Sequence, residues 1–304
     1  MDEIKKNIDI VIPCYNVEET IEDCIKSLCN QSLSKNEYNC YFVNDNSHDS
    51  TGGILEKYKT IENINVIHHK ENQGLAVTRN KGIKAGNSEM IAFLDGDMVV
   101  KKNWLESFLP YFDESVIAVM GDNIAPQNTS LNSVEKYYFG NLRGARKYQD
   151  GGKIPFQYML FGNAMVKRIV FQECGYFDES MKKYGGEDTD LSARIWDIYP
   201  KSFVFSKNSD SVHFHRRNLN EFCHSMYTYG KYNLPLLIRK HPHYKKKFAT
   251  DWIFTAKGKL FFSLPFKILI SLIIKIYPFQ ILIRYIVADA VIRGARSSEE
   301  SGHF

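Results

Sequence analysis

The sequence predicts an α/β fold in which a central, mostly parallel sheet is flanked by helices and followed by a C-terminal helical extension. In the first hundred residues, short β-branched apolar runs alternate with segments whose apolar residues recur at helical spacing. From residue 257 onward the composition shifts to long apolar runs broken by single lysines. The alternation is typical of a doubly wound sheet, whose ligand crevice lies where the strands end.

Strands and helices alternate regularly in the first third of the chain. Apolar runs predict four strands, at residues 8–12, 40–43, 64–67 and 90–94. Helical spacing predicts three helices between them, passing through residues 21–28, 54–58 and 74–86. Asn16 and Glu19 resemble a capping box before the first helix. Right-handed crossovers would bring Tyr15, Asp45 and residues 95–97 to one edge of the sheet.

The pattern loosens after residue 97. We expect a helix over 103–112, strands at 116–120 and 158–166, a helix through Leu191 and Ile198, and short strands at 203–205 and 212–215. A polar, glycine-bearing span over 141–153 is typical of a lid or binding loop, with simple disorder as the alternative.

Composition bounds the class of protein. With 304 residues and 44% hydrophobic content, the chain forms one large domain or two smaller ones around a sizeable core. The formal net charge is +4, and basic clusters in the last third indicate an anionic neighbour there. Six cysteines without a Cys-x-x-Cys pair favour a reducing compartment. The N-terminus lacks the long apolar region of a secretory signal, so we expect a cytoplasmic protein.

Three clusters of side chains are candidates for chemistry. Asp95 and Asp97 end the run at 90–94, where carboxylates can hold Mg²⁺ or Mn²⁺ together with a substrate phosphate; a solvated turn or helix cap is the alternative. Acidic side chains at 187, 188 and 190 begin a helix, where they also suit the helix dipole. His213 and His215 share a strand face and are either metal ligands or ordinary strand-end residues.

Taken together, these motifs resemble those of family 2 glycosyltransferases, the inverting enzymes with a GT-A-type fold, over roughly residues 8–230. The matching motifs are Ile-Pro-Cys-Tyr-Asn at 12–16, Val-Asn-Asp-Asn-Ser at 43–47, Asn-Gln-Gly at 72–74, Arg-Asn-Lys-Gly at 79–82, Asp-Gly-Asp at 95–97, Gly-Tyr-Phe-Asp-Glu at 175–179 and Gly-Glu-Asp-Thr-Asp-Leu at 186–191. Asn44 and Asn46 stand where an acidic residue and a glycine are more usual, which bears on base selectivity.

The resemblance implies a nucleoside pocket at the first strand ends. Pro13 and Tyr15 would wall the nucleobase, with the Tyr15 ring as a stacking face and Asn16 beside them. Asp45 would accept a hydrogen bond from a base N–H, and Arg79 would hold that carboxylate in place.

The resemblance also implies a metal and phosphate site. Asp95 would reach the ribose and lie beside the metal, and Asp97 would ligate the divalent cation that bridges the two phosphates. His213 or His215 would supply a further ligand, with His213 preferred because residues 213–216 resemble the family's His-x-x-Arg ending. Arg216 would contact phosphate.

Inversion requires a base on the sugar face opposite the leaving group. The resemblance points to Asp188 for this role. Glu187 is the competitor and is expected to bind donor sugar or acceptor. Asp178 and Asp190 are expected to be structural.

The C-terminal apolar segment allows two interpretations. Lys267, Ser271 and Lys275 lie four apart and predict a single polar stripe on an apolar helix, while Pro278 and Arg284 interrupt any span of the ~20 apolar residues needed to cross a bilayer. Residues 257–293 therefore either lie on a membrane surface, with lysines drawn to anionic lipid, or pack on the catalytic domain or on a second subunit.

The resulting hypothesis is a metal-dependent inverting glycosyltransferase, of the hexosyl or N-acetylhexosaminyl type. It would transfer a sugar from a nucleoside-diphosphate donor, UDP-linked, to a glycan or lipid-linked acceptor at the inner face of a bacterial-type membrane, without a nucleic-acid partner. Residues 1–100 would bind the nucleotide sugar, 101–225 would bind the acceptor, and 226–304 would form the helical extension. The rivals are an inactive sugar-nucleotide-binding or scaffold protein and a nucleotidyltransferase, whose glycine-rich phosphate loop is missing after the first strand.

Overall fold

The computed structural model describes residues 8–214, 217–248, 253 and 255–300 of the chain. These residues form two compact units. The first unit contains the sheet and comprises Met1–Gln127, Gly144–Lys182 and Glu187–His215, and the second is helical and comprises Asn128–Arg143, Lys183–Gly186 and Arg216–Phe304.

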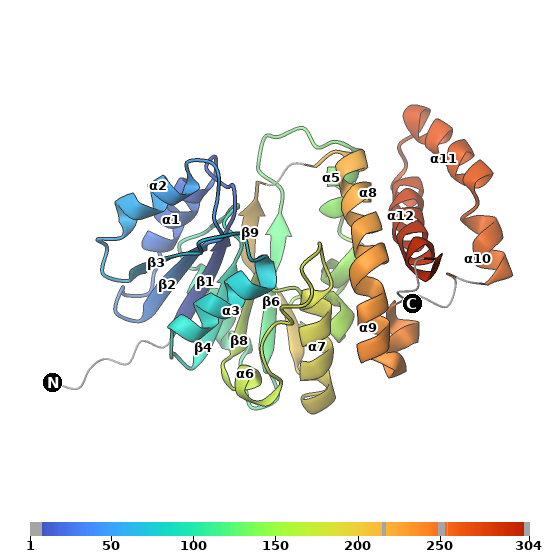
Figure 1. The fold of residues 1–304 in the computed structure, drawn as a ribbon. Coiled ribbons are helices and arrows are strands. Elements are labelled where there is room, and N and C mark those ends of the chain that lie inside the picture. The colour runs from blue at the N-terminus through green and yellow to red at the C-terminus, as the bar shows by residue number, and fades with distance from the viewer. Residues whose placement is uncertain (1–7, 215–216, 249–252, 254, 301–304) are drawn as a thin grey trace. The chain divides into compact units, whose positions relative to one another are not determined.

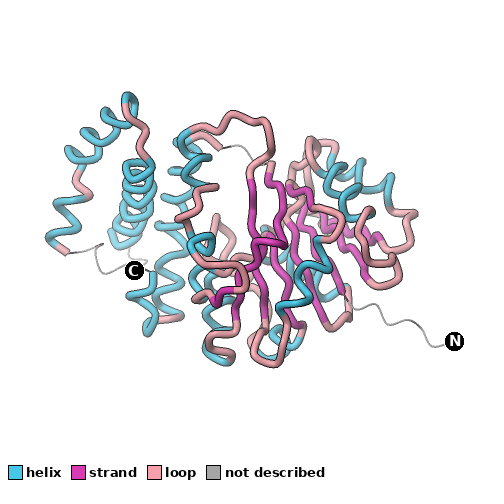
Figure 2. The backbone as a smooth tube through the Cα atoms, turned by 180° about the vertical axis from the view of Figure 1, so that it is seen from behind, coloured by secondary structure: helices cyan, strands magenta, loops and turns pink. Residues whose placement is uncertain are grey.

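One mixed sheet runs through the first unit (Figures 1 and 2). Its strands are β1 (Ile8–Cys14), β2 (Tyr38–Asn44), β3 (Ile64–His68), β4 (Met90–Leu94), β5 (Met98–Val100), β6 (Ala118–Ile124), β7 (Gly152–Lys153), β8 (Asn163–Lys167) and β9 (Phe203–His213). The order is β3-β2-β1-β4-β8-β6-β9-β5, with β7 paired to β9. Strands β1 to β4 are mutually parallel, whereas β8 runs antiparallel to both β4 and β6.

Helices cover both faces of this sheet. In the first unit they are α1 (Ile21–Cys29), α2 (Thr51–Tyr58), α3 (Leu75–Ala85), α4 (Trp104–Phe108), α6 (Ile169–Glu173) and α7 (Glu187–Ile198). Side chains of a strand alternate between faces. Ile10 and Ile12 of β1 accordingly join the buried cluster that contains the apolar residues of α1 and α4, whereas Val11 faces α3.

A buried carboxylate ties three segments of the first unit together. Asp9 is fully buried on β1 and accepts hydrogen bonds from the Ser88 backbone N–H at 2.8 Å and from the Ser88 hydroxyl at 2.9 Å. It also forms an ion pair with Arg168, which follows β8 and donates to the Ile83 carbonyl at 2.8 Å. The charge is therefore paired and hydrogen-bonded, as burial requires.

The first four strands and three helices confirm the predicted alternation. The capping box predicted at Asn16 and Glu19 is wrong, because helix α1 begins at Ile21 after Thr20 and the Asn16 amide oxygen accepts from the His48 backbone N–H at 2.9 Å. The helix predicted over 103–112 is shorter, since α4 passes into a 3₁₀ turn at Leu109–Tyr111.

Two predictions in the second half need correction. The span at 141–153 contains a 3₁₀ helix, Gly144–Lys147, and strand β7, and its role as a lid or binding loop stays a prediction. The strand predicted from 158 begins only at β8, because Phe156–Tyr158 is a 3₁₀ turn. The two strands predicted near 203 and 212 are one strand, β9, with a bulge between them.

The bulge in β9 is held by polar groups. Because these residues are polar, the sequence does not show the apolar pattern of a continuous strand here. Pairing with β6 passes from Gly121↔Ser206 to Asn123↔Ser211, so four residues of β9, 207–210, stand against the single residue Asp122 of β6. A Cβ atom at Gly121 would lie 2.0 Å from the Ser209 carbonyl oxygen, which explains the glycine. The amide of Asn163 donates to the same carbonyl at 2.9 Å.

The second unit is built from helices. They are α5 (Ser133–Tyr138), α8 (Leu219–Thr228), a π-helical turn (Tyr229–Asn233), α9 (Leu234–Lys240), α10 (Ala256–Phe261), α11 (Leu264–Ile276) and α12 (Gln280–Glu300). In the part of the chain that the structure describes, no helix combines the length and apolar character needed to cross a bilayer.

The polar stripe predicted on the C-terminal apolar helix is only partly correct. Lys267 of α11 faces α12, where its amino group lies 3.5 Å from the carboxylate of Asp289, a fully buried side chain that also pairs with Arg293 at 2.7 Å. Because the buried charge draws this lysine toward α12, Lys275 in the last turn is the one exposed lysine of α11.

The Asp9 cluster gives a stability test. The Asp9→Ala variant should lose about 3–5 kcal/mol of unfolding free energy, because the Arg168 guanidinium would remain partly buried without its carboxylate. Urea denaturation followed by the fluorescence of buried Trp104 measures the loss. The exposed Asp23→Ala variant should stay within about 0.5 kcal/mol of the wild type; equal urea midpoints for all three proteins would contradict the assigned role of Asp9.

Candidate active site

The guanidinium of Arg79 lies at the centre of a carboxylate cluster. Arg79 is on α3 and its side chain is 2% exposed. It donates to the Asp188 carboxylate at 2.7 Å and to the Asp95 carboxylate at 3.1 Å, and it lies 3.7 Å from that of Glu187. Burial lowers the pKa of Arg79, but the three carboxylates, Asp188 foremost, outweigh it and raise the pKa overall. Side chains from α3, the end of β4 and the start of α7 are thus held together by one cation.

Two carboxyl groups of this cluster, those of Glu187 and Asp95, have raised pKa values because burial disfavours their charged forms. Burial and, after it, the neighbouring Asp188 raise the pKa of Glu187 against the opposing effect of Arg79, to about 7 overall. Burial also raises the pKa of Asp95; Arg79 opposes that effect and Asp97 adds to it. A carboxyl group with a pKa near neutrality is typical of catalytic sites, although structural clusters produce it too.

Asp188 is oriented from two sides. Besides its contact with Arg79, its second oxygen accepts from the backbone N–H of Phe161 at 3.2 Å. The side chain begins α7, as the acidic run at 187–190 predicts. Asp190 in the same turn is fully buried and pairs with Arg194 at 2.9 Å, and Asp178 accepts from the Ser180 backbone N–H at 2.9 Å. Asp178 and Asp190 are therefore engaged in local structure, outside the Arg79 cluster.

Asp97 and His213 form a second pair beside the cluster. Strand β5 pairs antiparallel with β9 so that Met98 lies opposite His213. As a result Asp97 Oδ2 and His213 Nε2 are 3.2 Å apart, and both side chains are largely buried. Two ligands at ~2.1 Å from one cation and at right angles would be about 3 Å apart, so the pair fits a divalent metal. A direct hydrogen bond satisfies the same distance.

The loops after β1 and β2 are joined by reciprocal hydrogen bonds. The Asn16 backbone N–H donates to the Ser47 hydroxyl at 3.0 Å, and the Val17 N–H donates to the Thr51 hydroxyl at 2.9 Å. Pro13 is buried, while the Tyr15 ring is exposed and lies edge-on to His48. Asn16 has a left-handed backbone, with φ of 51°. The loop that carries the predicted nucleoside-binding residues is thus fixed in conformation by these hydrogen bonds.

The predicted contact between Asp45 and Arg79 is wrong. The two Asp45 oxygens accept from the backbone N–H groups of Gln73 and Gly74, each at 2.8 Å, and His69 Nδ1 lies 2.8 Å from Asp45 Oδ1. These N–H groups precede α3, where they have no partner within the helix. A nearby carboxylate satisfies them, and this contact is more favourable for Asp45 than reaching a distant arginine. Asp45 therefore anchors the start of α3, and its contact with a nucleobase stays a prediction.

The two unusual asparagines have local explanations. Asn46 adopts a left-handed backbone with φ of 56°, a conformation that glycine enters most easily and asparagine next. The side-chain oxygen of Asn44 accepts from the Ser47 backbone N–H at 3.1 Å, and its amide lies 3.0 Å from His68 Nδ1.

Several supporting residues escaped the sequence reasoning. A Cβ atom on Gly162 would lie 2.5 Å from Asp95 Oδ2, so the glycine makes room for that carboxylate. Asn80 binds both backbone groups of Phe177, at 3.0 and 2.9 Å, and the Phe177 ring lies 5.3 Å from the Arg79 guanidinium carbon. Asn80 could have been found from its place beside Arg79 in a motif, whereas nothing in the sequence singles out Gly162.

The structure thus brings together Arg79, Asp95, Glu187 and Asp188, with Asp97 and His213 next to them. Two predicted residues, His215 and Arg216, lie outside the described residues. The preference for His213 as a metal ligand rests on its pairing with Asp97, and its role stays a prediction.

Comparisons with known proteins agree on the class. A family model described as glycosyl transferase family 2 matches residues 9–175. The teichuronic acid biosynthesis glycosyltransferase TuaG of Bacillus subtilis is 36% identical over 69% of this chain and 91% of its own length. For several other curated relatives, such as the glycosyltransferase EpsH of B. subtilis and AglE of Haloferax volcanii, the match spans 30% and 39% of the relative's length.

Solved structures show the same GT-A-type fold. The mannosyltransferase PcManGT from Pyrobaculum calidifontis, in complex with GDP-Man and Mn²⁺, has a TM-score of 0.68 at 14% identity and covers 97% of this chain and 87% of its own. TarS from Staphylococcus aureus, residues 1–349 with UDP-GlcNAc, has a TM-score of 0.57 at 17% identity and covers 97% and 91%.

The raised pKa of Glu187 predicts how stability depends on pH. The pKa of Glu187 is 4.5 in the unfolded chain and about 7 in the folded protein. Its contribution to the stability of the folded state is fully present at pH values below 4.5 and is lost as the pH rises through about 7. Between about pH 5 and about pH 8, the Glu187→Gln variant should therefore gain about 2–3 kcal/mol relative to the wild type. Urea denaturation across this range measures the difference. Parallel pH profiles for the two proteins would show that Glu187 ionises normally.

Proposed function

The chain belongs to glycosyl transferase family 2, and from this premise we propose that it transfers a sugar, with inversion, from a nucleoside-diphosphate donor to a hydroxyl of a glycan or lipid-linked acceptor. The observation that carries the proposal is the cluster of Asp95, Glu187 and Asp188 around Arg79, beside the Asp97–His213 pair. It supplies a candidate base, a candidate cation site and a rigid support in one unit of the fold.

We place the donor along the edge where the parallel strands end. Tyr15 offers an exposed ring for base stacking, with Pro13 and Asn16 forming the wall of the pocket and Asp45 below it. Asp95, partly exposed and held by Arg79, suits a ribose hydroxyl. Arg216 would contact phosphate. A UDP-linked hexose or N-acetylhexosamine is our proposed donor; TarS, with UDP-GlcNAc, and PcManGT, with GDP-Man, represent the two base classes that an assay must separate.

Asp97 and His213 are the residues that would hold a divalent cation, Mn²⁺ or Mg²⁺, with Asp95 adjacent and His215 as a further candidate ligand. When bound, such a cation offsets the charge that grows on the departing nucleoside diphosphate. The carboxylate donor suits either metal, and both side chains are largely buried.

Asp188 is the proposed base. Its carboxylate would take the proton from the acceptor hydroxyl as that oxygen attacks the anomeric carbon. The contacts with Arg79 and with the Phe161 N–H fix its position, and each oxygen keeps a further lone pair for the acceptor. Glu187, buried beside it, would bind donor sugar or acceptor. Its raised pKa makes it the residue against which Asp188 must be tested.

We further propose that the reaction takes place on the cytoplasmic side of the membrane, in the assembly of a surface glycan. The six cysteines are all free thiols, three of them buried, which suits a reducing compartment. TuaG and the minor teichoic acid biosynthesis protein GgaB of B. subtilis are named for cell-wall polymers.

The enzymatic proposal is tested by incubating the purified protein with Mn²⁺ and a panel of UDP- and GDP-sugars, with and without lipid-linked acceptors. The wild type should release nucleoside diphosphate from at least one donor. The Asp188→Asn variant should transfer about 10²–10⁴ times more slowly while binding the donor nearly as well in calorimetry, because only the proton acceptor is lost.

Three outcomes would contradict these assignments. If no donor releases nucleoside diphosphate under any condition, the transferase proposal fails. If the Asp188→Asn variant stays within tenfold of the wild type while Glu187→Gln falls a hundredfold, Glu187 is the base. If neither variant loses activity, the base lies elsewhere.

Metal binding is tested separately from turnover. The Asp97→Asn and His213→Gln variants should each bind Mn²⁺ more weakly, by more than the ~10–100-fold that loss of an outer-shell partner costs. Calorimetric titration of Mn²⁺ in the presence of nucleoside diphosphate gives the affinities, and the exposed Asp113→Asn variant serves as the control. Unchanged Mn²⁺ affinity in both variants would leave the Asp97–His213 pair as a structural hydrogen bond.

A further inference from the structure

The exposed side of helix α11 is apolar over most of its length, with Lys275 near its C-terminal end. Leu264, Ile268, Leu272 and Ile276 lie four residues apart and are 58%, 52%, 56% and 71% exposed. The opposite side of the helix, including Ile270, packs against α12 in a buried cluster. A surface helix normally directs its polar residues toward solvent, whereas α11 directs mostly apolar residues there.

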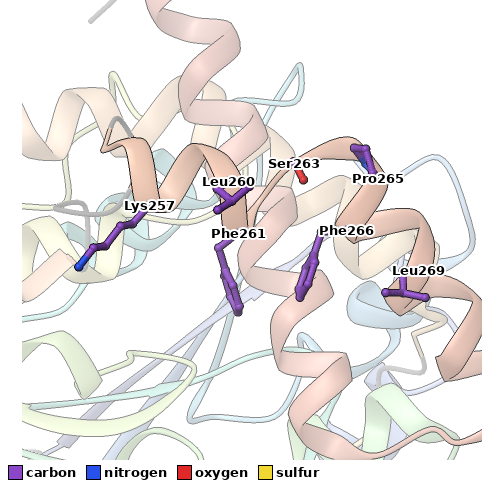
Figure 3. Close-up of a pocket in the computed structure, with 7 residues that line it drawn as sticks. All are labelled: Lys257, Leu260, Phe261, Ser263, Pro265, Phe266 and Leu269. Atoms are coloured by element: carbon purple, nitrogen blue, oxygen red, sulfur yellow. The ribbon is translucent and has the colours of Figure 1, made fainter.

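The apolar surface continues beyond this stripe. It includes ten large exposed hydrophobic residues: Leu260, Phe261, Leu264, Ile268, Leu269, Leu272, Ile276, Tyr277, Phe279 and Ile281. Within it, α10 and α11 enclose a hollow of about 590 Å³. Figure 3 shows Phe261 and Phe266 projecting side by side into this region, with Lys257 at its edge. We call this surface the apolar face. Soluble monomers seldom expose such a contiguous patch without a partner.

The exposed charged residues of α10, of α11 and of the first half of α12 are all positive. Residues 255–288 contain no aspartate or glutamate. Lys257, Lys259, Lys275 and Arg284 are exposed, and no carboxylate among the described residues pairs with them. Lys267 is the exception, because it is turned inward to Asp289. The apolar face is therefore rimmed by unpaired cations.

We propose that the apolar face docks on a lipid bilayer that carries anionic headgroups. A helix that lies in the plane of a membrane buries its apolar side at the acyl boundary, and lysines and arginines at its edge contact the headgroups. Tyr277 is of the kind that prefers this interface, and Phe261 and Phe279 suit the apolar side. The hollow between α10 and α11 would accept part of an acyl chain.

A second copy of the chain is a poorer occupant. In a two-fold dimer the same patch faces itself, so each cation of the rim would meet the partner's cations with no carboxylate to pair with. A bilayer supplies both the apolar phase and the negative charge. The docking does not rest on the proposed transfer reaction, and its test measures lipid binding without any turnover.

The test is co-sedimentation of the purified full chain with vesicles. Vesicles of equal parts phosphatidylcholine and phosphatidylglycerol should pellet the protein, and vesicles of phosphatidylcholine alone should bind it much more weakly. Raising the salt concentration should reduce binding to the anionic vesicles, because the rim charges are exposed and screened. Replacing Lys257, Lys259 and Lys275 by glutamine should weaken binding about fivefold for each lysine, roughly a hundredfold together.

A matched pair of variants separates the apolar face from general hydrophobicity. The triple variant Leu264→Ser, Ile268→Ser and Leu272→Ser removes exposed side chains and should weaken vesicle binding at least about tenfold. The control variant, Leu109→Ser, Leu142→Ser and Ile198→Ser, removes equally apolar exposed residues from elsewhere and should bind like the wild type. Circular dichroism verifies that all variants melt like the wild type.

Several results would overturn the proposal. The wild type would fail to pellet with anionic vesicles, or would bind neutral and anionic vesicles equally, or the two triple serine variants would lose binding to the same extent. If sedimentation velocity instead shows a dimer that dissociates on the Leu264, Ile268 and Leu272 substitutions, and vesicles do not bind, a second copy occupies the apolar face.

Discussion

The ion pairs of Arg79 are the interaction on which the arrangement of the site depends. One guanidinium meets carboxylates from β4 and from α7, which lie about a hundred residues apart in the chain. With Asp97 nearby, four carboxylates face one arginine and one histidine, so the negative charge is incompletely balanced. Such an imbalance is costly unless protons or cations enter. Burial foremost, with the neighbouring carboxylates adding to it, raises the pKa values of Glu187 and Asp95 against the opposing effect of Arg79. The same imbalance suits a site that must attract a metal ion and accept a proton.

Much of the fold could be predicted because the first half of the chain uses strong, repeated patterns. Buried parallel strands are continuous apolar runs, and β1, β2 and β4 show them plainly. Strand β5 is three residues long, and β9 carries polar residues over its bulge, so neither has a pattern that periodicity detects. Both are defined by pairing with distant strands, which composition does not reveal.

The candidate site could be predicted as a set of residues but not as a set of contacts. Asp95, Asp97, Asp188 and His213 were each identifiable from motifs, yet the partner of Arg79 was not. Choosing among several carboxylates depends on local competition: the free N–H groups before α3 take Asp45, and this leaves Arg79 for the others. Lys267 illustrates the same limit, since its periodicity suggested an outward polar stripe and the buried Asp289 reversed it. Side-chain partners of this kind are settled by tertiary packing.

The bulge in β9 has a consequence for how this protein can change in length. His213 reaches Asp97 only because the residues after the bulge resume pairing with β5 and β6 in one alternation of faces. Deleting or inserting a single residue between 207 and 210 would reverse that alternation and point the histidine to the opposite side, whereas a change of two residues would preserve it. Natural variants should therefore tolerate insertions or deletions of two residues in this segment, but not of one. The distance between His213 and Asp97 thus depends partly on the length of residues 207–210.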